Sequence, residues 1–523
     1  MTHIRATSVA TRVVSHVTFR SIPSMTQTLR TITLAVALAL LPACGGNVPG
    51  ASDTGAQSSQ QKLVLTSCRV ANVKEDLRCG IHEVFENREA KSGRKLPLKI
   101  ILVPARSPHP ELKPVFYLAG GPGETNTEFV EAALGSSFHE DHDIVLVDSR
   151  GTGKGHRLAC RMPRSDDHLE DYLHTPFAPE IARACRAELE RRFDLSQYST
   201  AAMVDDLDEV RQALGYDKIN LTGGSFGTYA ALMYMRAHGE RVRSAYLVSL
   251  VTLENRVPLY HAWGAQWALE RLFEQCAADS ACHGAYPNLR EDFSAVLARL
   301  HQAPVQASVR HPVSGAKTKI DLTEQAFADA VRVMMYSGAR GREVPFLIAQ
   351  AKGGDFDLLA ETAIDANRGF YGAAPLGLYY AVTCNEFVDR IRPGDVEPAT
   401  RGSYAGAARV RDQMASCEAW PKTTLPPGYF EPFRSEVPAL LISGNTDPAS
   451  PPRWGDAVHA FLPNSVHVVV RGGHVPVTGC TDQVAAAMFR SGSAKGLDLG
   501  CMASLRPAPF KLPGASTRAT ARF

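Results

Sequence analysis

Short apolar runs that stop at turn residues recur along the chain, and they predict buried strands of a parallel sheet. The early runs are followed by Ala-Gly-Gly-Pro-Gly, Asp-Ser-Arg-Gly and Thr-Gly-Gly-Ser, and the late ones by Gly-Asn-Thr-Asp and Arg-Gly-Gly-His. The predicted strands cover residues 98–103, 115–118, 143–147, 218–221, 437–443 and 465–470.

The segments between these runs predict helices. Residues 203–214 carry apolar positions at helical spacing between two predicted strands, which indicates a right-handed parallel crossover. From about 257 to 432 the chain has the pattern of helices and loops, with helical stretches at 265–276 and 322–335. We therefore expect a mostly parallel α/β core (62–256 and 433–510), a helical cap inserted at 257–432, and a tail at 511–523.

The composition excludes some classes of protein. Hydrophobic residues make up 45% and charged residues 21% of the 523 positions, as in an ordinary globular protein. The 56 Lys and Arg residues nearly balance the 54 Asp and Glu residues, so the formal net charge is +2. Such a balance gives no sign of the clustered basic face that a nucleic-acid partner requires, and we expect none.

The N-terminus resembles an export signal. It is rich in arginine, has no acidic residue before Asp53, and contains the apolar run Leu34–Leu41. That run is shorter than the roughly 20 residues that span a bilayer but suits a signal-peptide core. The sequence Leu-Pro-Ala-Cys-Gly ending at Gly45 resembles a bacterial lipoprotein cleavage box, which predicts acylation of Cys44. A plain secretory signal and an organelle transit peptide are the alternatives.

The expected mature protein follows from that signal. Residues 1–44 form the signal peptide, with Met1 or Met25 as its start, and residues 45–61, rich in Gly, Ser, Ala and Gln, form a flexible tether. We expect an exported protein, held in the bacterial cell envelope or secreted. Its contact with a membrane is through the N-terminal lipid alone.

Cysteine usage agrees with export. Removing Cys44 from the 11 cysteines leaves ten, an even number that an exported protein can pair. A sequence does not determine connectivity, but neighbours along the chain suggest Cys68–Cys79, Cys160–Cys185, Cys276–Cys282, Cys384–Cys417 and Cys480–Cys501. No pair has the C-x-x-C spacing of a metal cluster, so we expect no metal site.

A candidate nucleophile lies at Ser225. Gly223-Gly-Ser-Phe-Gly227 fits the G-x-S-x-G pattern, follows a predicted strand and precedes a predicted helix at 228–236. This strand–turn–helix order is that of the nucleophile elbow in the α/β-hydrolase fold, where a tight turn exposes the serine hydroxyl. The alternative is a glycine-rich turn that only packs a helix against the sheet.

A serine nucleophile requires a base within hydrogen-bond reach. In this fold the acid and then the histidine follow the serine along the chain, beyond the carboxyl ends of strands. Asp447 follows the strand at 437–443 and His474 follows the strand at 465–470. The rivals His467 and Glu436 lie at or before the beginning of a strand, at the opposite edge of the sheet.

Acyl transfer also requires donors for the developing oxyanion. One candidate is the backbone N–H of Phe226, directly after the nucleophile. The second is the N–H of Gly121, in the glycine-rich loop after an early strand, where a backbone without side chains can approach a substrate. A plain turn is the alternative for that loop.

These motifs together resemble the prolyl and tripeptidyl aminopeptidase family. The likeness rests on Leu118–Gly123, Asp148–Gly153, Gly223–Thr228, Gly444–Pro448 and Gly-Gly-His474, and it covers about residues 63–510. The spacing of Cys480, Phe489, Gly496, Cys501 and Pro509-Phe510 is similar to the C-terminal segment of the tripeptidyl branch. The chain departs from the family at Ala119, Ser149 and Ser249-Leu250, where relatives often carry His, Gln and Asp-Gly.

The resemblance implies a serine exopeptidase that releases residues from the free N-terminus of short peptides without a cofactor. In prolyl relatives, glutamates of the cap hold the substrate ammonium, and Glu386 is the candidate here. A carboxylesterase or lipase with the same triad is the second hypothesis, because fold and triad do not specify the scissile bond. A non-catalytic surface lipoprotein is the third, and the intact Ser225, Asp447 and His474 argue against it.

Overall fold

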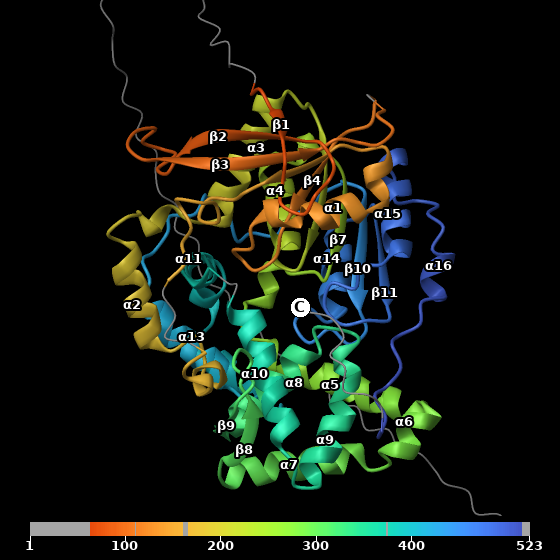
Figure 1. Ribbon diagram of the computed structural model, residues 1–523. Helices are drawn as coiled ribbons and strands as arrows, with labels where there is room; N and C mark the ends of the chain where they lie inside the picture. The colour runs from red at the N-terminus through yellow and green to blue at the C-terminus, as the bar shows by residue number, and fades with distance from the viewer. Residues whose placement is uncertain (1–62, 110, 161–165, 373–374, 515–523) are drawn as a thin grey trace, which may run out of the picture. The chain divides into compact units, whose positions relative to one another are not determined.

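A mixed sheet organises the part of the chain that the structure describes, which is residues 63–109, 111–160, 166–372 and 375–514 of a computed structural model (Figure 1). The signal peptide, Cys44, the tether and residues 515–523 of the tail lie outside these residues. The strands of this sheet, in spatial order, are β1 (Thr66–Cys68), β2 (Leu77–Phe85), β3 (Lys95–Val103), β5 (Ile144–Val147), β4 (Val115–Leu118), β6 (Ile219–Gly224), β7 (Val242–Val248), β10 (Ala439–Gly444) and β11 (Ser465–Val470).

The sheet is parallel over most of its width. Strands β5, β4, β6, β7, β10 and β11 pair in parallel, whereas β1, β2 and β3 form an antiparallel margin. This confirms the predicted fold class. The predicted strands are all present, with bounds shifted by no more than three residues. The sequence reading did not identify β1 and β2.

Helices cover both faces of the sheet, and successive strand residues enter different cores. Ile100 and Leu102 pack in one core with residues of α3 and α4, whereas Ile101 and Val103 pack in another with residues of α1 and α15. The helices are α1 (Val130–Gly135), α2 (Pro179–Leu189), α3 (Thr200–Leu214), α4 (Phe226–His238), α5 (His261–Ala278), α6 (Ser280–Ala285), α7 (Leu289–Gln302), α8 (Glu324–Met334), α9 (Val344–Lys352), α10 (Asp357–Gly372), α11 (Leu376–Glu386), α12 (Pro393–Thr400), α13 (Ala408–Glu418), α14 (Arg453–Phe461), α15 (Gly479–Ser491) and α16 (Gly500–Ala503).

The segment between β7 and β10 carries α5 to α13, and we call residues 257–432 the cap. It differs from the prediction in one element: β8 (Val305–Arg310) and β9 (Lys317–Leu322) pair as an antiparallel hairpin. Its strands alternate between exposed and buried residues, a period-two pattern that the sequence reading missed. The cap also has an apolar core of its own. The described residues nevertheless belong to one compact unit, so cap and sheet are not separate bodies.

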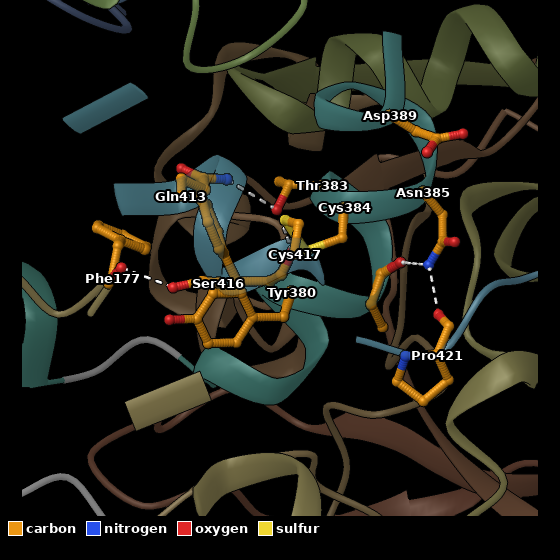
Figure 2. Close-up of a disulfide and its surroundings, with 12 residues drawn as sticks. Phe177, Tyr380, Thr383, Cys384, Asn385, Asp389, Gln413, Ser416, Cys417 and Pro421 are labelled. Carbon is orange, nitrogen blue, oxygen red and sulfur yellow. Dashed lines mark hydrogen bonds between the residues drawn. A yellow bond between two sulfur atoms is a disulfide. The ribbon is translucent and has the colours of Figure 1, made fainter. Parts of the chain in front are cut away.

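Five disulfides connect neighbours along the chain, in the pairs that the sequence order suggests. Figure 2 shows Cys384–Cys417, which links α11 to α13. Next to it, Gln413 Nε2 donates to Thr383 Oγ1 over 3.1 Å, and Ser416 Oγ donates to the Phe177 carbonyl over 2.7 Å. This bridge therefore holds together two cap helices that also contact the chain before β6.

We expect the loss of Cys384–Cys417 to destabilise the fold more than the loss of Cys276–Cys282. Both bridges are buried, but they close loops of 33 and 6 residues respectively. The loop-closure entropy of the unfolded chain then predicts a stabilisation of about 4 kcal/mol for the long loop and about 2 kcal/mol for the short one. Urea unfolding of the two double Cys→Ser variants measures the difference. An equal or larger loss in the short-loop variant would contradict this ordering.

Candidate active site

Ser225 lies at a sharp turn between β6 and α4. Its backbone has φ 54° and ψ −123°, a combination that non-glycine residues rarely adopt and that suits an exposed nucleophile. Its N–H donates to the Val248 carbonyl over 2.9 Å, which attaches the turn to β7. Gly227 is required because a Cβ there would overlap the Leu118 carbonyl of β4. The predicted elbow is therefore present.

Asp447 lies beyond the end of β10 with its side chain fully buried, at 0% exposure. Its carboxylate accepts from His474 Nδ1 at 2.8 and 3.0 Å and from Ser249 Oγ at 2.8 Å. The backbone N–H groups of Ala449 and Ser450 each donate to it over 2.8 Å. Burial alone would raise the pKa of Asp447, but His474 and these hydrogen bonds outweigh burial and hold the pKa below its usual value.

The cap and the elbow both contact the loop that carries His474. The His474 N–H donates to the Tyr336 carbonyl of the cap over 2.7 Å, and the two rings are 4.8 Å apart in an edge-on arrangement. Gly473 has no room for a Cβ, which would overlap that same carbonyl. A Cβ added to Gly224 would lie 3.0 Å from the Val475 side chain. The residue after His474 thus packs against the residue before Ser225.

The rival residues lie elsewhere. His467 is within β11, where its ring bonds to Asp456 Oδ1 and Ser443 Oγ, each over 2.9 Å. Glu436 is exposed and pairs with Arg434 and Asn464. Neither contacts Asp447, so the structure brings together the acid and base that the sequence favoured.

Two backbone donors of the loop after β4 are engaged. The Ala119 N–H donates to Asn126 Oδ1 over 2.6 Å, and the Gly120 N–H donates to Glu124 Oε2 over 2.9 Å. The Gly121 N–H has no recorded acceptor among the described residues, and Gly121 has φ 107°. Phe226 begins α4, so its N–H lacks an intrahelical partner. Neither predicted oxyanion donor has an acceptor among the described residues, and their role stays a prediction.

Glu124 adds a negative charge to this region that the sequence reading did not identify. One oxygen accepts from Gly120, while no donor to Oε1 is recorded among the described residues. The side chain reaches solvent, yet the surrounding protein desolvates it and raises the pKa of its carboxyl. The Gly120 N–H and the charge of His474 both lower the pKa of Glu124 and oppose that rise. Glu124 is therefore near enough to the candidate base to interact with its charge.

Glu386 has a different role from the predicted one. Its side chain is fully buried, and both oxygens are engaged: the Thr200 N–H and the Tyr429 hydroxyl each donate over 2.7 Å. Burial raises the pKa of Glu386, and those two donors oppose the rise. The carboxylate caps the first turn of α3 and joins it to α11. It therefore links cap and core, and its complete burial keeps both oxygens out of reach of a substrate ammonium in this structure.

Ser249, like Glu124, was given no role in the sequence analysis. It follows β7 with φ 60°, donates to Asp447 and accepts from the Val475 N–H over 2.8 Å. One hydroxyl thus connects the acid to the loop of the base. Ser249 comes directly after a strand, and reactive groups in parallel sheets lie beyond strand ends, so this rule was a signal for its position. The sequence analysis noted Ser249 only as a departure from the family.

Within the described residues, no group of acidic, histidine and cysteine side chains could hold a metal ion. The same residues include no helix long and apolar enough to cross a bilayer.

The chain belongs to the alpha/beta hydrolase fold family, which it matches over residues 113–477. It is similar to Serine protease Hip1 of Mycobacterium tuberculosis, with 25% identity over 512 positions that cover 88% of this chain and 94% of that protein. Tripeptidyl aminopeptidase of Streptomyces lividans is 24% identical, covering 39% of this chain and 41% of that protein. Proline iminopeptidase of Neisseria gonorrhoeae is 28% identical, covering 27% and 34%.

We expect Ser249→Ala to slow the reaction and to lower the free energy of unfolding, while the protein still folds. The variant removes a donor to a buried carboxylate and an acceptor for the Val475 N–H, each worth about 1–3 kcal/mol. We expect kcat to fall about 10- to 100-fold on a nitrophenyl ester, with KM nearly unchanged. Ser244→Ala is the control, because Ser244 is also buried on β7 but bonds only to Asn220. Equal kcat values in the two variants would show that Ser249 does not position the acid.

Proposed function

We propose that this protein is a serine exopeptidase that cleaves short peptides from a free N-terminus, with Ser225 as nucleophile, His474 as base and Asp447 as acid. The supporting observation is the strained elbow at Ser225, packed against the loop of a histidine that a buried aspartate holds. The similarity to Serine protease Hip1 over most of both chains favours a peptide bond over an ester as substrate.

The proposed reaction has two steps. Ser225 Oγ attacks the scissile carbonyl carbon while His474 Nε2 takes the hydroxyl proton. The N–H groups of Gly121 and Phe226 stabilise the oxyanion, and His474 gives its proton to the leaving amine. Water then attacks the acyl-enzyme by the same route and frees Ser225. Asp447 remains ionised and holds Nδ1–H, which stabilises the imidazolium.

We further propose export, as a lipoprotein or a secreted protein. Support comes from the predicted signal at residues 1–44 and from the five disulfides, since disulfides persist in oxidising compartments.

Glu124 replaces Glu386 as the proposed anchor for the substrate ammonium. It belongs to the loop that also carries the oxyanion donor Gly121, its side chain is accessible, and one carboxylate oxygen is uncommitted. A carboxylate close to the scissile bond would favour peptides with a free N-terminus and would direct cleavage to bonds near that N-terminus. Ammonium binding would also lower the raised pKa of Glu124, since opposite charges favour ionisation.

Replacing the nucleophile should abolish activity without unfolding the protein. We expect Ser225→Ala to lower kcat by about 10⁶-fold, as removal of a triad serine does. Fluorophosphonate labelling should be stoichiometric in the wild type and absent from the variant. Labelling that persisted at another residue would refute the assignment of Ser225.

Glu124→Gln should separate peptidase from esterase behaviour. We expect kcat/KM for peptides with a free N-terminus to fall about 10- to 100-fold, because the ammonium loses its counter-charge. N-acetylated peptides and nitrophenyl esters should be affected little. Acid protonates Glu124 and removes the charge that attracts the ammonium, so the wild-type preference for free N-termini should fade as the pH falls. Because the pKa of Glu124 is raised, this loss should begin at a higher pH than the pKa of an ordinary glutamate would give.

The control for this experiment is Glu386→Gln. That change perturbs the link between α3 and α11, so any loss should be equal on free peptides, blocked peptides and esters. If the wild type cleaved N-acetylated peptides as well as free ones, the exopeptidase proposal would fail in favour of an endopeptidase or an esterase.

A further inference from the structure

A pocket of about 260 Å³ lies beside the loops that carry the acid and the base of the proposed triad. Its walls come from α5, from the cap segment after α8, from the residues just before Asp447 and His474, and from residues 506–508 near the C-terminus. None of Ser225, Asp447 and His474 lines it, nor do the proposed oxyanion donors. It is therefore a separate site from the proposed catalytic centre.

Three arginines from three distant segments line this pocket: Arg342 of the cap, Arg471 of the histidine loop and Arg506 of the C-terminal segment. No aspartate or glutamate is among the lining residues. Arg342 is 8% exposed, and burial lowers its pKa; the positive charge of Arg471 lowers it further, while Asp279 opposes both. The pocket therefore concentrates positive charge that its own walls do not neutralise.

The hydrogen bonds of Arg342 and Arg506 go to neutral groups, and Asp279 acts on Arg342 only from beyond ion-pair distance. Arg342 Nη2 donates to the neutral Gln275 Oε1 over 2.6 Å, and its guanidinium stacks 4.1 Å from the ring centre of Phe510. Arg506 donates to the Ser504 carbonyl over 3.3 Å. Among the described residues no carboxylate lies within ion-pair distance of any of the three arginines. A buried cation without a counter-charge is costly, and a bound anion removes that cost.

We propose that this pocket binds a phosphate group, either free or carried by a small molecule. A guanidinium fork matches the spacing of phosphate oxygens, and three forks suit a dianion with several acceptor oxygens better than a single carboxylate. The pocket volume is several times the roughly 30 Å³ of one water in the liquid, so a phosphate with its waters fits.

Occupation of this pocket stabilises the loops next to the proposed triad. Gly472 donates to Asn445 Oδ1 over 3.1 Å and accepts from the Thr446 N–H over 3.0 Å, so the acid and histidine loops already contact each other in the pocket wall. A dianion that bridges Arg342, Arg471 and Arg506 adds the cap and the C-terminal segment to that contact. A ligand of the folded state raises stability by mass action.

The test is the melting temperature and the calorimetric binding isotherm of the full chain with inorganic phosphate, against sodium chloride at equal ionic strength. We expect saturable binding and a rise in Tm of about 2 °C or more. Arg471→Gln and Arg506→Gln should each weaken phosphate binding about 10-fold. Arg471 and Arg506 are exposed, so replacing them should leave the fold intact. Arg342 is not replaced, because it is buried and its loss could unfold the protein.

The matched control is Arg299→Gln, because Arg299 is also exposed and donates to one backbone carbonyl, that of Ala303. It should bind phosphate like the wild type. Equal effects of phosphate and chloride, or unchanged binding in both pocket variants, would overturn the proposal. Binding of succinate as tight as that of phosphate would overturn the choice of a phosphate group. These readouts use no substrate, so they are independent of the proposed peptidase activity.

Discussion

The buried carboxylate of Asp447 is the contact on which the arrangement of the candidate site depends. It joins three strand ends, because its donors come from the loops after β7, β10 and β11. A carboxylate without water is stable only when donors surround it, and the reduced pKa of Asp447 shows that these donors outweigh the cost of burial. The same contacts hold the ring of His474 at Nδ1 and leave Nε2 for the serine.

The cap contacts this centre through the backbone of Tyr336, and it contacts the core through the buried carboxylate of Glu386. Tyr336 receives the His474 N–H, so the cap determines where the histidine loop lies. Glu386 connects α11 to the first turn of α3, and Cys384, two residues earlier, is bridged to α13. The bond from the Thr200 N–H to Glu386 is buried and, like the bond from the His474 N–H to Tyr336, crosses the boundary between cap and core, in line with the single compact unit that the two parts form.

Charge is distributed unevenly around the site. Glu124 brings a carboxylate with an uncommitted oxygen next to the proposed oxyanion hole, where it suits an ammonium. In the pocket beside the acid and histidine loops, three arginines are among the lining residues, and no described carboxylate lies within ion-pair distance of Arg342, Arg471 or Arg506. A net charge near zero therefore conceals local charges of opposite sign, at Glu124 and in the arginine pocket, which composition alone could not reveal.

The sequence by itself determined the parallel part of the sheet and the elbow, and it suggested the order of the proposed nucleophile, acid and base. Apolar runs and glycines specify strands and tight turns locally, and parallel strands carry the residues after them to one edge. It also suggested the disulfide pairs from their order. Only the tertiary structure shows the surroundings of Glu386, Glu124 and Ser249, because burial and hydrogen-bond partners depend on how the whole chain folds. The arginine pocket could not be predicted from the sequence for the same reason. Arg342, Arg471 and Arg506 are far apart in the chain and line one pocket only in the folded protein.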